Sequence, residues 1–225
     1  MLKLLIQQAN IDYYGFFATP AFNLMGDSQT ILAGLYKTFA PYNLGLGNFK
    51  LEGDLSEPST NAVVVRLGRF GIFRFKFDQV QASLNQFSDE DLAGMVSVIE
   101  KGTSWVREAI TDLAFKTHAF VYIGHGTLSE GTSRDFLLSL PRRATPILGE
   151  DLGSGIVESW HDANLDAKVR LTIDHSLQQQ DGLFINYMVV FEREKINLVD
   201  IARDSRKMLD VFLEGLGLEL EPGVS

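Results

Sequence analysis

The sequence predicts an α+β fold in which strands and amphipathic helices alternate. Residues 88–113 carry apolar side chains at helical spacing, whereas the segments on both sides of them alternate apolar and polar residues as half-buried strands do. A helix of about 26 residues spans roughly 39 Å, which is enough to cross a domain. The links between strands are too short for parallel crossovers, so we expect an antiparallel sheet.

The central helix at residues 88–113 has a clear start signal. Ser88 is the expected N-cap, and Asp91 three residues later resembles the second member of a capping box. Acidic residues in the first turn also suit the helix dipole. Its apolar stripe is expected to consist of Leu92, Met95, Val96, Ile99, Val106, Ile110 and Leu113.

The chain before this helix predicts four strands and one helix. Asp27 or Ser28 is the expected helix cap, and Pro41 ends that helix because proline cannot continue the hydrogen-bond ladder. Gly68 and Arg69 are a candidate hairpin turn between the last two strands. In order we expect a strand at 2–18, a helix at 27–39, a strand at 44–54, an exposed loop at 54–61, and strands at 62–67 and 70–77.

The chain after the central helix predicts a similar series. Two prolines and three glycines make 141–155 the least structured stretch. Asn197 is the expected cap of the final helix, and Gly215 and Gly217 end it. In order we expect a strand at 117–127, a helix at 133–140, strands at about 155–161, 167–175 and 183–192, and a helix at about 198–213.

The predicted order, β-α-β-β-β-α followed by β-α-β-β-β-α, suggests two similar halves, residues 1–114 and residues 115–225, in one compact unit. We expect the helices mainly on one face of a saddle-like or barrel-like antiparallel sheet. An unduplicated α+β domain with the same elements is the alternative. The order resembles the duplicated saddle-like folds of the TATA-binding protein and the GyrI-like effector-binding domains. No sequence motif of either family occurs, so the resemblance implies a fold and assigns no residue roles.

Composition and charge narrow the class of protein. Hydrophobic residues make up 45% of the 225 residues, which is enough for a packed core. The net charge of −9 argues against a nucleic-acid partner, because such partners are bound by neutralising phosphates. The absence of cysteine excludes disulfides and thiolate metal sites. No run approaches 18 apolar residues and the N-terminal apolar run is too short for a signal peptide, so we expect a soluble, cytoplasmic protein with no membrane contact.

Three motifs suggest chemistry, and each has a simpler explanation. His125 and His175 lie near strand ends where they could meet, but the four histidines lack the close spacing of metal ligands, so no metal site is expected. The glycines around His125 suggest a phosphate loop, although a strand that turns into the helix at Ser133 explains them as well. Asp174, His175 and Ser176 are triad residue types, but neighbours in a strand point to opposite faces.

The strongest surface signal is a set of basic residues at the polar positions of alternating strands. Phe73, Phe75 and Phe77 should face the helices, as should the apolar residues of 167–175, so their neighbours share the opposite face. The candidate binding residues on that face are Arg66, Arg74, Lys76, Lys168 and Arg170. The simpler explanation is that any exposed sheet face must be polar.

The sequence therefore favours a non-enzymatic binding or interaction protein without a cofactor, which uses the basic sheet face to bind a protein partner or to self-associate. The alternative is a small-molecule effector-binding or hydrolytic domain with a site between the halves. A deep apolar pocket with converging Tyr, Glu or His groups would favour this alternative. A flat or concave exposed sheet without such a pocket would favour the first function.

Overall fold

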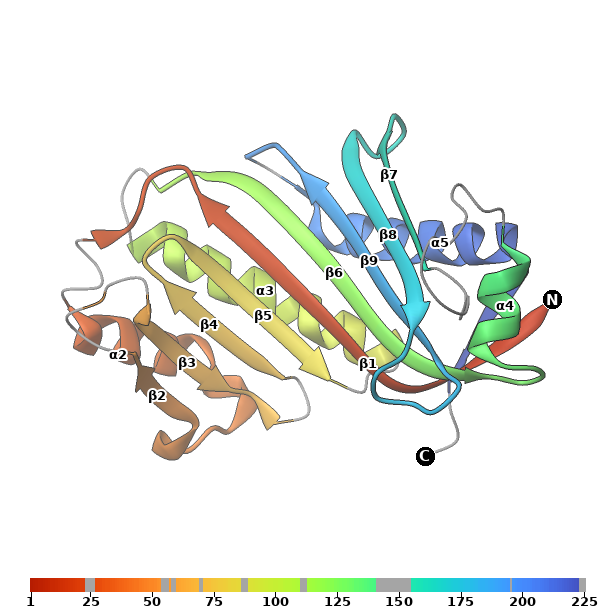
Figure 1. Cartoon of the computed structure of the whole chain (residues 1–225). Helices are drawn as coiled ribbons and strands as arrows, with labels where there is room; N and C mark the ends of the chain where they lie inside the picture. Colours follow the sequence, from red (N-terminus) through yellow and green to blue (C-terminus); the bar gives the residue numbers. More distant parts are fainter. Residues whose placement is uncertain are drawn as a thin grey trace. The chain divides into compact units, whose positions relative to one another are not determined.

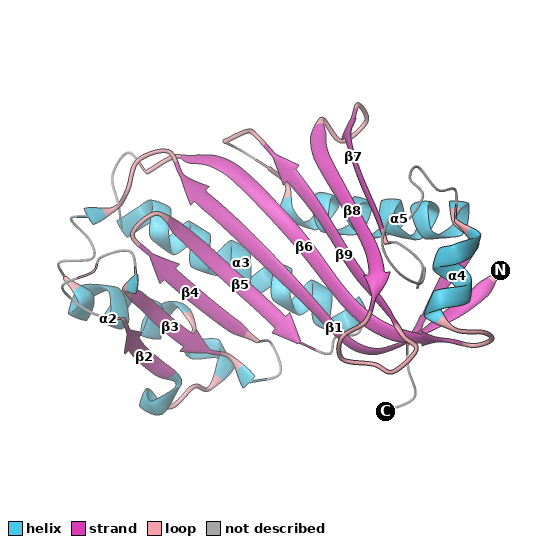
Figure 2. Ribbon diagram, viewed as in Figure 1, coloured by secondary structure: helices cyan, strands magenta, loops and turns pink. Residues whose placement is uncertain are grey.

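The computed structural model describes residues 1–22, 27–53, 57, 60–68, 71–85, 89–109, 113–140, 155–194 and 196–222 (Figure 1 and Figure 2). The helices of these residues are α2 (Ser28–Thr38), α3 (Asp89–Ala109), α4 (Ser133–Ser139) and α5 (Leu198–Gly215), with short 3₁₀ turns at Ala40–Tyr42 and Leu46–Asn48. The strands are β1 (Leu2–Phe17), β2 (Phe49–Glu52), β3 (Ala62–Arg66), β4 (Ile72–Lys76), β5 (Gln79–Asn85), β6 (Phe115–Leu128), β7 (Ile156–Asp162), β8 (Ala167–His175), β9 (Leu183–Phe191) and β10 (Leu218–Pro222).

The strands form one open sheet in the order β2-β3-β4-β5-β1-β6-β9-β8-β7, and β10 pairs with β1. The hairpin pairs β3–β4, β4–β5 and β7–β8 are antiparallel, whereas β10 runs parallel to β1 with Leu218 opposite Leu2. The prediction of an α+β fold with an antiparallel sheet is thus confirmed, and β10 is an exception to the expected strand direction. The internal duplication and the placement of helices mainly on one face stay predictions.

The chain forms two compact units that are not contiguous in sequence. Unit 1 contains residues 1–10, 121–189 and 203–225, and unit 2 contains residues 11–120 and 190–202. The two units are defined by contacts in space and are not the two halves predicted from the sequence, so the division of the chain at residue 114 also stays a prediction.

The core of unit 2 is built from aromatic side chains between β4 and two helices. Phe73 and Phe75 are completely buried. The ring of Phe73 lies 5.5 Å from that of Phe39, which follows α2, and the ring of Phe75 lies 6.5 Å from that of Trp105 in α3. A β-carbon added to Gly102 would lie under 3.0 Å from two ring carbons of Phe73. The glycine therefore lets the backbone of α3 lie directly against the aromatic ring.

The helix signals of the sequence are largely confirmed. Asp27 caps α2 by accepting a hydrogen bond from the Thr30 N–H at 3.0 Å, and Asn197 caps α5 by accepting one from the Val199 N–H at 3.1 Å. In α3 the predicted stripe residues Met95, Val96, Ile99 and Val106 are buried. The expected cap Ser88 and the stripe residue Ile110 lie outside the described residues, and the expected stripe residue Leu113 lies beyond the end of α3 at Ala109.

Unit 1 shows the alternation that was expected of its strands. In β8 the side chains of Val169, Leu171 and Ile173 are buried, and the intervening residues are exposed or half-buried. In β9 every second residue from Leu183 to Phe191 is buried in the same way. The apolar side of α5 contributes Leu209 and Leu213, each of which is 1% exposed.

Two strands were missed from the sequence. β5 follows β4 after a turn at Phe77 and Asp78, so the first half contains one strand more than predicted. Its buried residues Val80, Ala82 and Leu84 alternate with polar ones, which is the ordinary strand pattern. β10 follows α5 after Gly217, whose φ of 78° suits a glycine at a helix end. Strand 44–54 was predicted too long, because Leu46–Asn48 form a 3₁₀ turn.

Some predicted features fall on residues outside the described ranges. The expected unstructured stretch 141–155 lies there except for Gly155, and so do Arg69 of the hairpin turn and most of the loop 54–61. At the described part of the hairpin, the Leu67 N–H donates to the Gly71 carbonyl at 2.8 Å. None of the helices in the described residues is long and apolar enough to span a membrane.

Candidate functional site

The five basic residues predicted as a binding face lie on strands of both units. In unit 2, Arg74 is opposite Val64 and Lys76 is opposite Ala62 in the register of β3 and β4, so both share a face with Arg66. Arg66 is exposed, whereas the other two are half-buried. In unit 1, Lys168 and Arg170 are exposed and occupy alternate positions of β8. Each set shares a face within its own unit, and the joint action of all five stays a prediction.

Arg74 lies next to a buried carboxylate that sequence reasoning missed. Asp12 on β1 is only 8% exposed, and within the described structure its Oδ1 atom has no hydrogen-bond partner. Burial raises the pKa of the Asp12 carboxyl, whereas hydrogen bonds from Ser83 and Tyr14 and the charge of Arg74 oppose that shift. Arg74 therefore interacts electrostatically with Asp12 within its own unit. The one available signal was an acidic residue between Ile11 and Tyr13 in an apolar strand.

A second buried polar group in unit 2 joins Tyr13 and His118. The Tyr13 hydroxyl lies 2.8 Å from His118 Nδ1, and His118 Nε2 lies 3.2 Å from the Glu194 carbonyl oxygen. Because the carbonyl can only accept, Nε2 carries the proton and the tyrosine donates to Nδ1. Burial, helped by the charges of Arg107 and Arg193, lowers the pKa of His118. These bonds fix a neutral histidine in the core, which is a structural role.

The remaining candidate residues form two separate serine–histidine pairs in unit 1. His125 Nδ1 lies 2.9 Å from Ser176 Oγ, and Ser133 Oγ lies 2.9 Å from His175 Nδ1. His125 and His175 therefore each have a serine partner, and the Asp174 carboxylate accepts from the His175 backbone N–H at 2.7 Å. The structure does not assemble Asp174, His175 and Ser176 into a triad.

The glycine-rich segment around His125 is part of a strand. Gly124, Gly126 and Thr127 all lie within β6, five or more residues before α4 begins at Ser133. The interpretation as a strand that leads into this helix is confirmed, and the phosphate loop at a helix start is wrong. Among the described residues, no three His, Asp or Glu side chains converge as metal ligands would.

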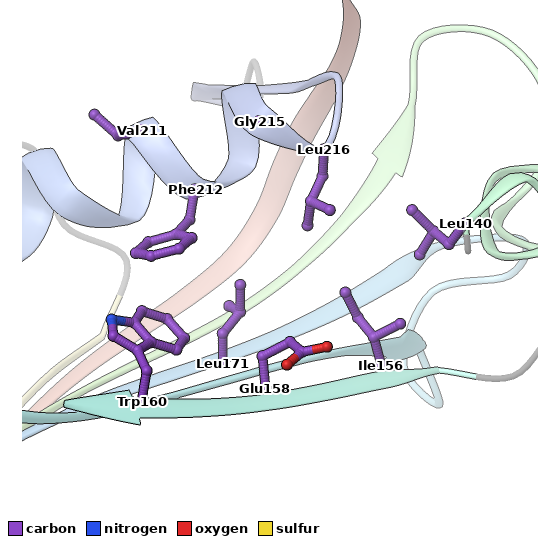
Figure 3. Close-up of a pocket in the computed structure, with 9 residues that line it drawn as sticks. All are labelled: Leu140, Ile156, Glu158, Trp160, Leu171, Val211, Phe212, Gly215 and Leu216. Atoms are coloured by element: carbon purple, nitrogen blue, oxygen red, sulfur yellow. The ribbon is translucent and has the colours of Figure 1, made fainter. Parts of the chain in front are cut away.

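A cavity suited to a ligand lies within unit 1, between the end of α5 and the strands β7 and β8 (Figure 3). Its volume is about 610 Å³. The inner side of β7 contributes Ile156, Glu158 and Trp160, which alternate along the strand as the period of two requires. Leu171 of β8 completes this wall, since it lies directly opposite Glu158 in the register. The other side is formed by Leu140, Val211, Phe212, Gly215 and Leu216.

The pocket has one aromatic end and one acidic group. The ring centroids of Trp160 and Phe212 lie 4.2 Å apart with an interplanar angle of 45°, so the two rings are in contact, and Figure 3 shows Phe212 directly over Trp160. The Glu158 side chain lies between Trp160 and Ile156 along β7 (Figure 3). No atom lies within 4 Å of a β-carbon built on Gly215, so a side chain at this position would extend into open space.

The sequence contained no usable signal for this pocket. Its lining comes from four separate parts of the chain, and each residue there follows its own strand or helix pattern. The pocket lies inside the predicted second half, residues 115–225. Comparisons with known proteins add no assignment: no protein-family model matches the sequence, and no curated protein matches it.

Proposed function

We propose that the protein is a non-enzymatic binding protein whose unit 1 pocket holds a small apolar molecule. The observation that carries this proposal is the cavity of about 610 Å³ between α5 and β7. Small-molecule sites typically measure about 300–1,000 Å³ and are lined mainly by apolar and aromatic side chains with a few polar groups. The pocket fits both criteria, which supports the small-molecule part of the alternative derived from the sequence.

The lining favours binding over catalysis. Of the nine described residues that line it, eight are apolar and Glu158 alone has an ionisable side chain (Figure 3). Acid–base or nucleophilic catalysis generally needs at least two groups in defined positions, such as a nucleophile and its base. The two serine–histidine pairs and the Tyr13–His118 pair do not line this pocket.

The test is binding of Nile red, a neutral apolar dye, to the wild type and to two variants of Gly215. Gly215→Trp adds a large side chain to the pocket wall, and Gly215→Ala is the matched control. Both substitutions are free of steric conflict at the β-carbon. We expect saturable binding to the wild type and to Gly215→Ala, and binding at least tenfold weaker to Gly215→Trp. Equal binding by all three proteins, or none by the wild type, would contradict the proposal.

A second candidate function is protein interaction through the basic strand positions. The register that places Arg66, Arg74 and Lys76 on one face of β3 and β4 favours it. Such an interaction, including self-association, should weaken as salt screens the charges. Sedimentation at low and high salt would test it with Arg66→Glu and Arg170→Glu, both at exposed positions. Arg74 is less suitable, because a glutamate there would face the Asp12 carboxylate.

We also propose that the fold is a duplication with its helices mainly on one face of the sheet. What supports it is the order of elements, in which β1 and α2 precede antiparallel strands and α3, and β6 and α4 precede antiparallel strands and α5. An experimental structure in which residues 1–114 fail to superpose on residues 115–216 would contradict it.

A further inference from the structure

The strand β2 forms the edge of the sheet in unit 2 (Figure 1). Its neighbour β3 shows which way the backbone groups of this edge point. On the β4 side, the N–H of Leu67, which follows β3, donates to the Gly71 carbonyl. On the β2 side, the Arg66 carbonyl accepts from the Asn48 side chain at 3.0 Å. Because the backbone groups of an antiparallel strand alternate between its two neighbours, the even-numbered residues of β3 are those that bond to β2.

The same alternation places one set of backbone groups at the open edge. Lys50 and Glu52 lie opposite even-numbered residues of β3, so both bond to β3. The N–H and C=O groups of Leu51, which lies between them, therefore point away from β3. No other strand among the described residues pairs with this side of β2. The edge can thus accept one more strand through Leu51.

The side chains of this edge have one charged side and one apolar side. Lys50 and Glu52 are exposed and share one side of β2, and neither forms an ion pair in the described part of the chain. Leu51 is 55% exposed and lies on the other side together with Phe49. There the Phe49 ring lies 5.3 Å from that of Tyr36 in α2, which is itself 45% exposed. The edge therefore combines charges of both signs with exposed apolar surface.

We propose that β2 pairs with β2 of a second copy of this chain, so that the protein forms a two-fold symmetric dimer. The two strands run antiparallel with Leu51 opposite Leu51, and each Leu51 N–H donates to the Leu51 carbonyl of the other copy. In this register Lys50 lies opposite Glu52 of the second copy, and the two-fold axis repeats the pair. The two Leu51 side chains meet on the apolar side of the strands.

The order of the charges is what identifies the partner. A lysine on an edge strand ordinarily discourages pairing with another strand. Here a glutamate follows two residues later, and an antiparallel strand with the same charge order matches both groups. A second copy supplies that order by symmetry. The strand β7, the last in the order of the sheet, lacks this property, because antiparallel pairing about its middle residue Ser159 would put Glu158 opposite Trp160.

Sedimentation equilibrium at increasing protein concentration tests the dimer. A stable interface buries at least about 1,200 Å² in total, and a four-residue strand supplies only part of this area. We therefore expect a reversible dimer that forms at high protein concentration. Lys50→Glu and Glu52→Lys should each raise its dissociation constant about tenfold or more, because each puts like charges opposite each other at two places. Lys116→Glu is the matched control, since it makes the same charge change at an exposed residue of β6.

Mixing and exchanging the charges separates this register from a general effect of charge. Lys50→Glu carries two negative groups on the edge, and Glu52→Lys carries two positive ones. An equimolar mixture of the two variants should dimerise at least as tightly as the wild type, although each variant alone stays monomeric. The double variant with both exchanges should dimerise as the wild type does, because the exchange restores the two pairs.

Three results would overturn the inference. One is a wild type that stays monomeric at every concentration. Another is a dimer that Lys50→Glu weakens no more than Lys116→Glu does, which would mean that the copies meet through a different surface. The third is a mixture of the two charge variants that fails to dimerise. None of these results bears on the pocket of unit 1, which the binding of Nile red tests separately.

Discussion

Gly102→Ala should destabilise unit 2, although alanine is the better helix former. Gly102 lies within α3, where exchange to alanine alone would stabilise the helix by up to about 1 kcal/mol. The new methyl group, however, would lie under 3.0 Å from Cε2 and Cζ of Phe73. That ring is 0% exposed and also lies against Phe39, so it has little space to move.

The size of the effect follows from the balance of these two terms. Overpacking a core by one carbon costs about 1–3 kcal/mol. Subtracting the helix gain leaves a net loss of up to about 2 kcal/mol, which lowers the melting temperature of a chain of this size by up to about 8 °C. Gly215→Ala is the control, because its β-carbon meets no atom within 4 Å. It should be neutral or slightly stabilising.

Urea unfolding followed by Trp105 fluorescence reports on α3, the helix that carries the Gly102 substitution. Trp105 lies three residues after Gly102 in α3, and Trp160→Phe removes the other tryptophan of the chain. The double variant Gly102→Ala with Phe73→Leu should lose less stability than the sum of the single changes, because the smaller side chain relieves the contact. If Gly102→Ala is more stable than the wild type by about 1 kcal/mol, which is the full helix gain, the added methyl group meets no obstacle and the close approach of α3 to β4 is refuted.

Three further predictions concern buried groups of unit 2. Ile99→Ala should destabilise by about 2–5 kcal/mol in urea melts, because this α3 residue is 0% exposed, and a loss below about 1 kcal/mol would mean that it is not core. Asp12→Asn should stabilise the protein by about 1 kcal/mol near pH 7, because it removes a buried charge. The pKa of Asp12 is raised in the folded state, so the stability that its protonated form contributes is lost as pH rises. Thermal melts should therefore show that the gain in Asp12→Asn vanishes below about pH 3.8. The pKa of His118 is lowered, so the stability that its neutral ring contributes is present above about pH 6.5 and is lost as pH falls. The melting temperature of His118→Gln should therefore depend less on pH between 7 and 5 than that of the wild type, and an equal dependence would refute this.

Sequence patterns predicted those elements in which one face is buried and the other is exposed to solvent. β4 and β8 alternate cleanly, and the stripe of α3 is continuous over several turns, so local periodicity was sufficient. β5 has the same alternation, but the predicted strand ended at residue 77 and residues 78–87 were not assigned to an element. Its polar residues Gln81 and Ser83 are joined by a hydrogen bond of 3.1 Å, and Ser83 also bonds to the carboxyl group of Asp12.

The candidate pocket could not be predicted in the same way. Local periodicity indicates which side of a strand faces a helix, but it carries no information about the space left between them. Trp160 and Phe212 are 52 positions apart and meet only because β7 and the part of α5 from Arg203 onward lie in unit 1. The basic residues had a local signal, whereas the electrostatic interaction of Arg74 with Asp12 depends on the order of β1, β5 and β4 in the sheet, which only the structure reveals.

The way the chain passes between the two units limits how the protein can be divided experimentally. It crosses from one unit to the other four times, at residues 10–11, 120–121, 189–190 and 202–203. The first three crossings fall inside β1, β6 and β9, and the last falls inside α5, so each one lies within regular secondary structure and not within a linker. No single cleavage site or truncation separates the units, and expression of residues 1–114 alone would produce the first ten residues of unit 1 without the rest of that unit. Domain-by-domain dissection is therefore the wrong approach for this chain, and point substitutions in the intact protein are the informative ones.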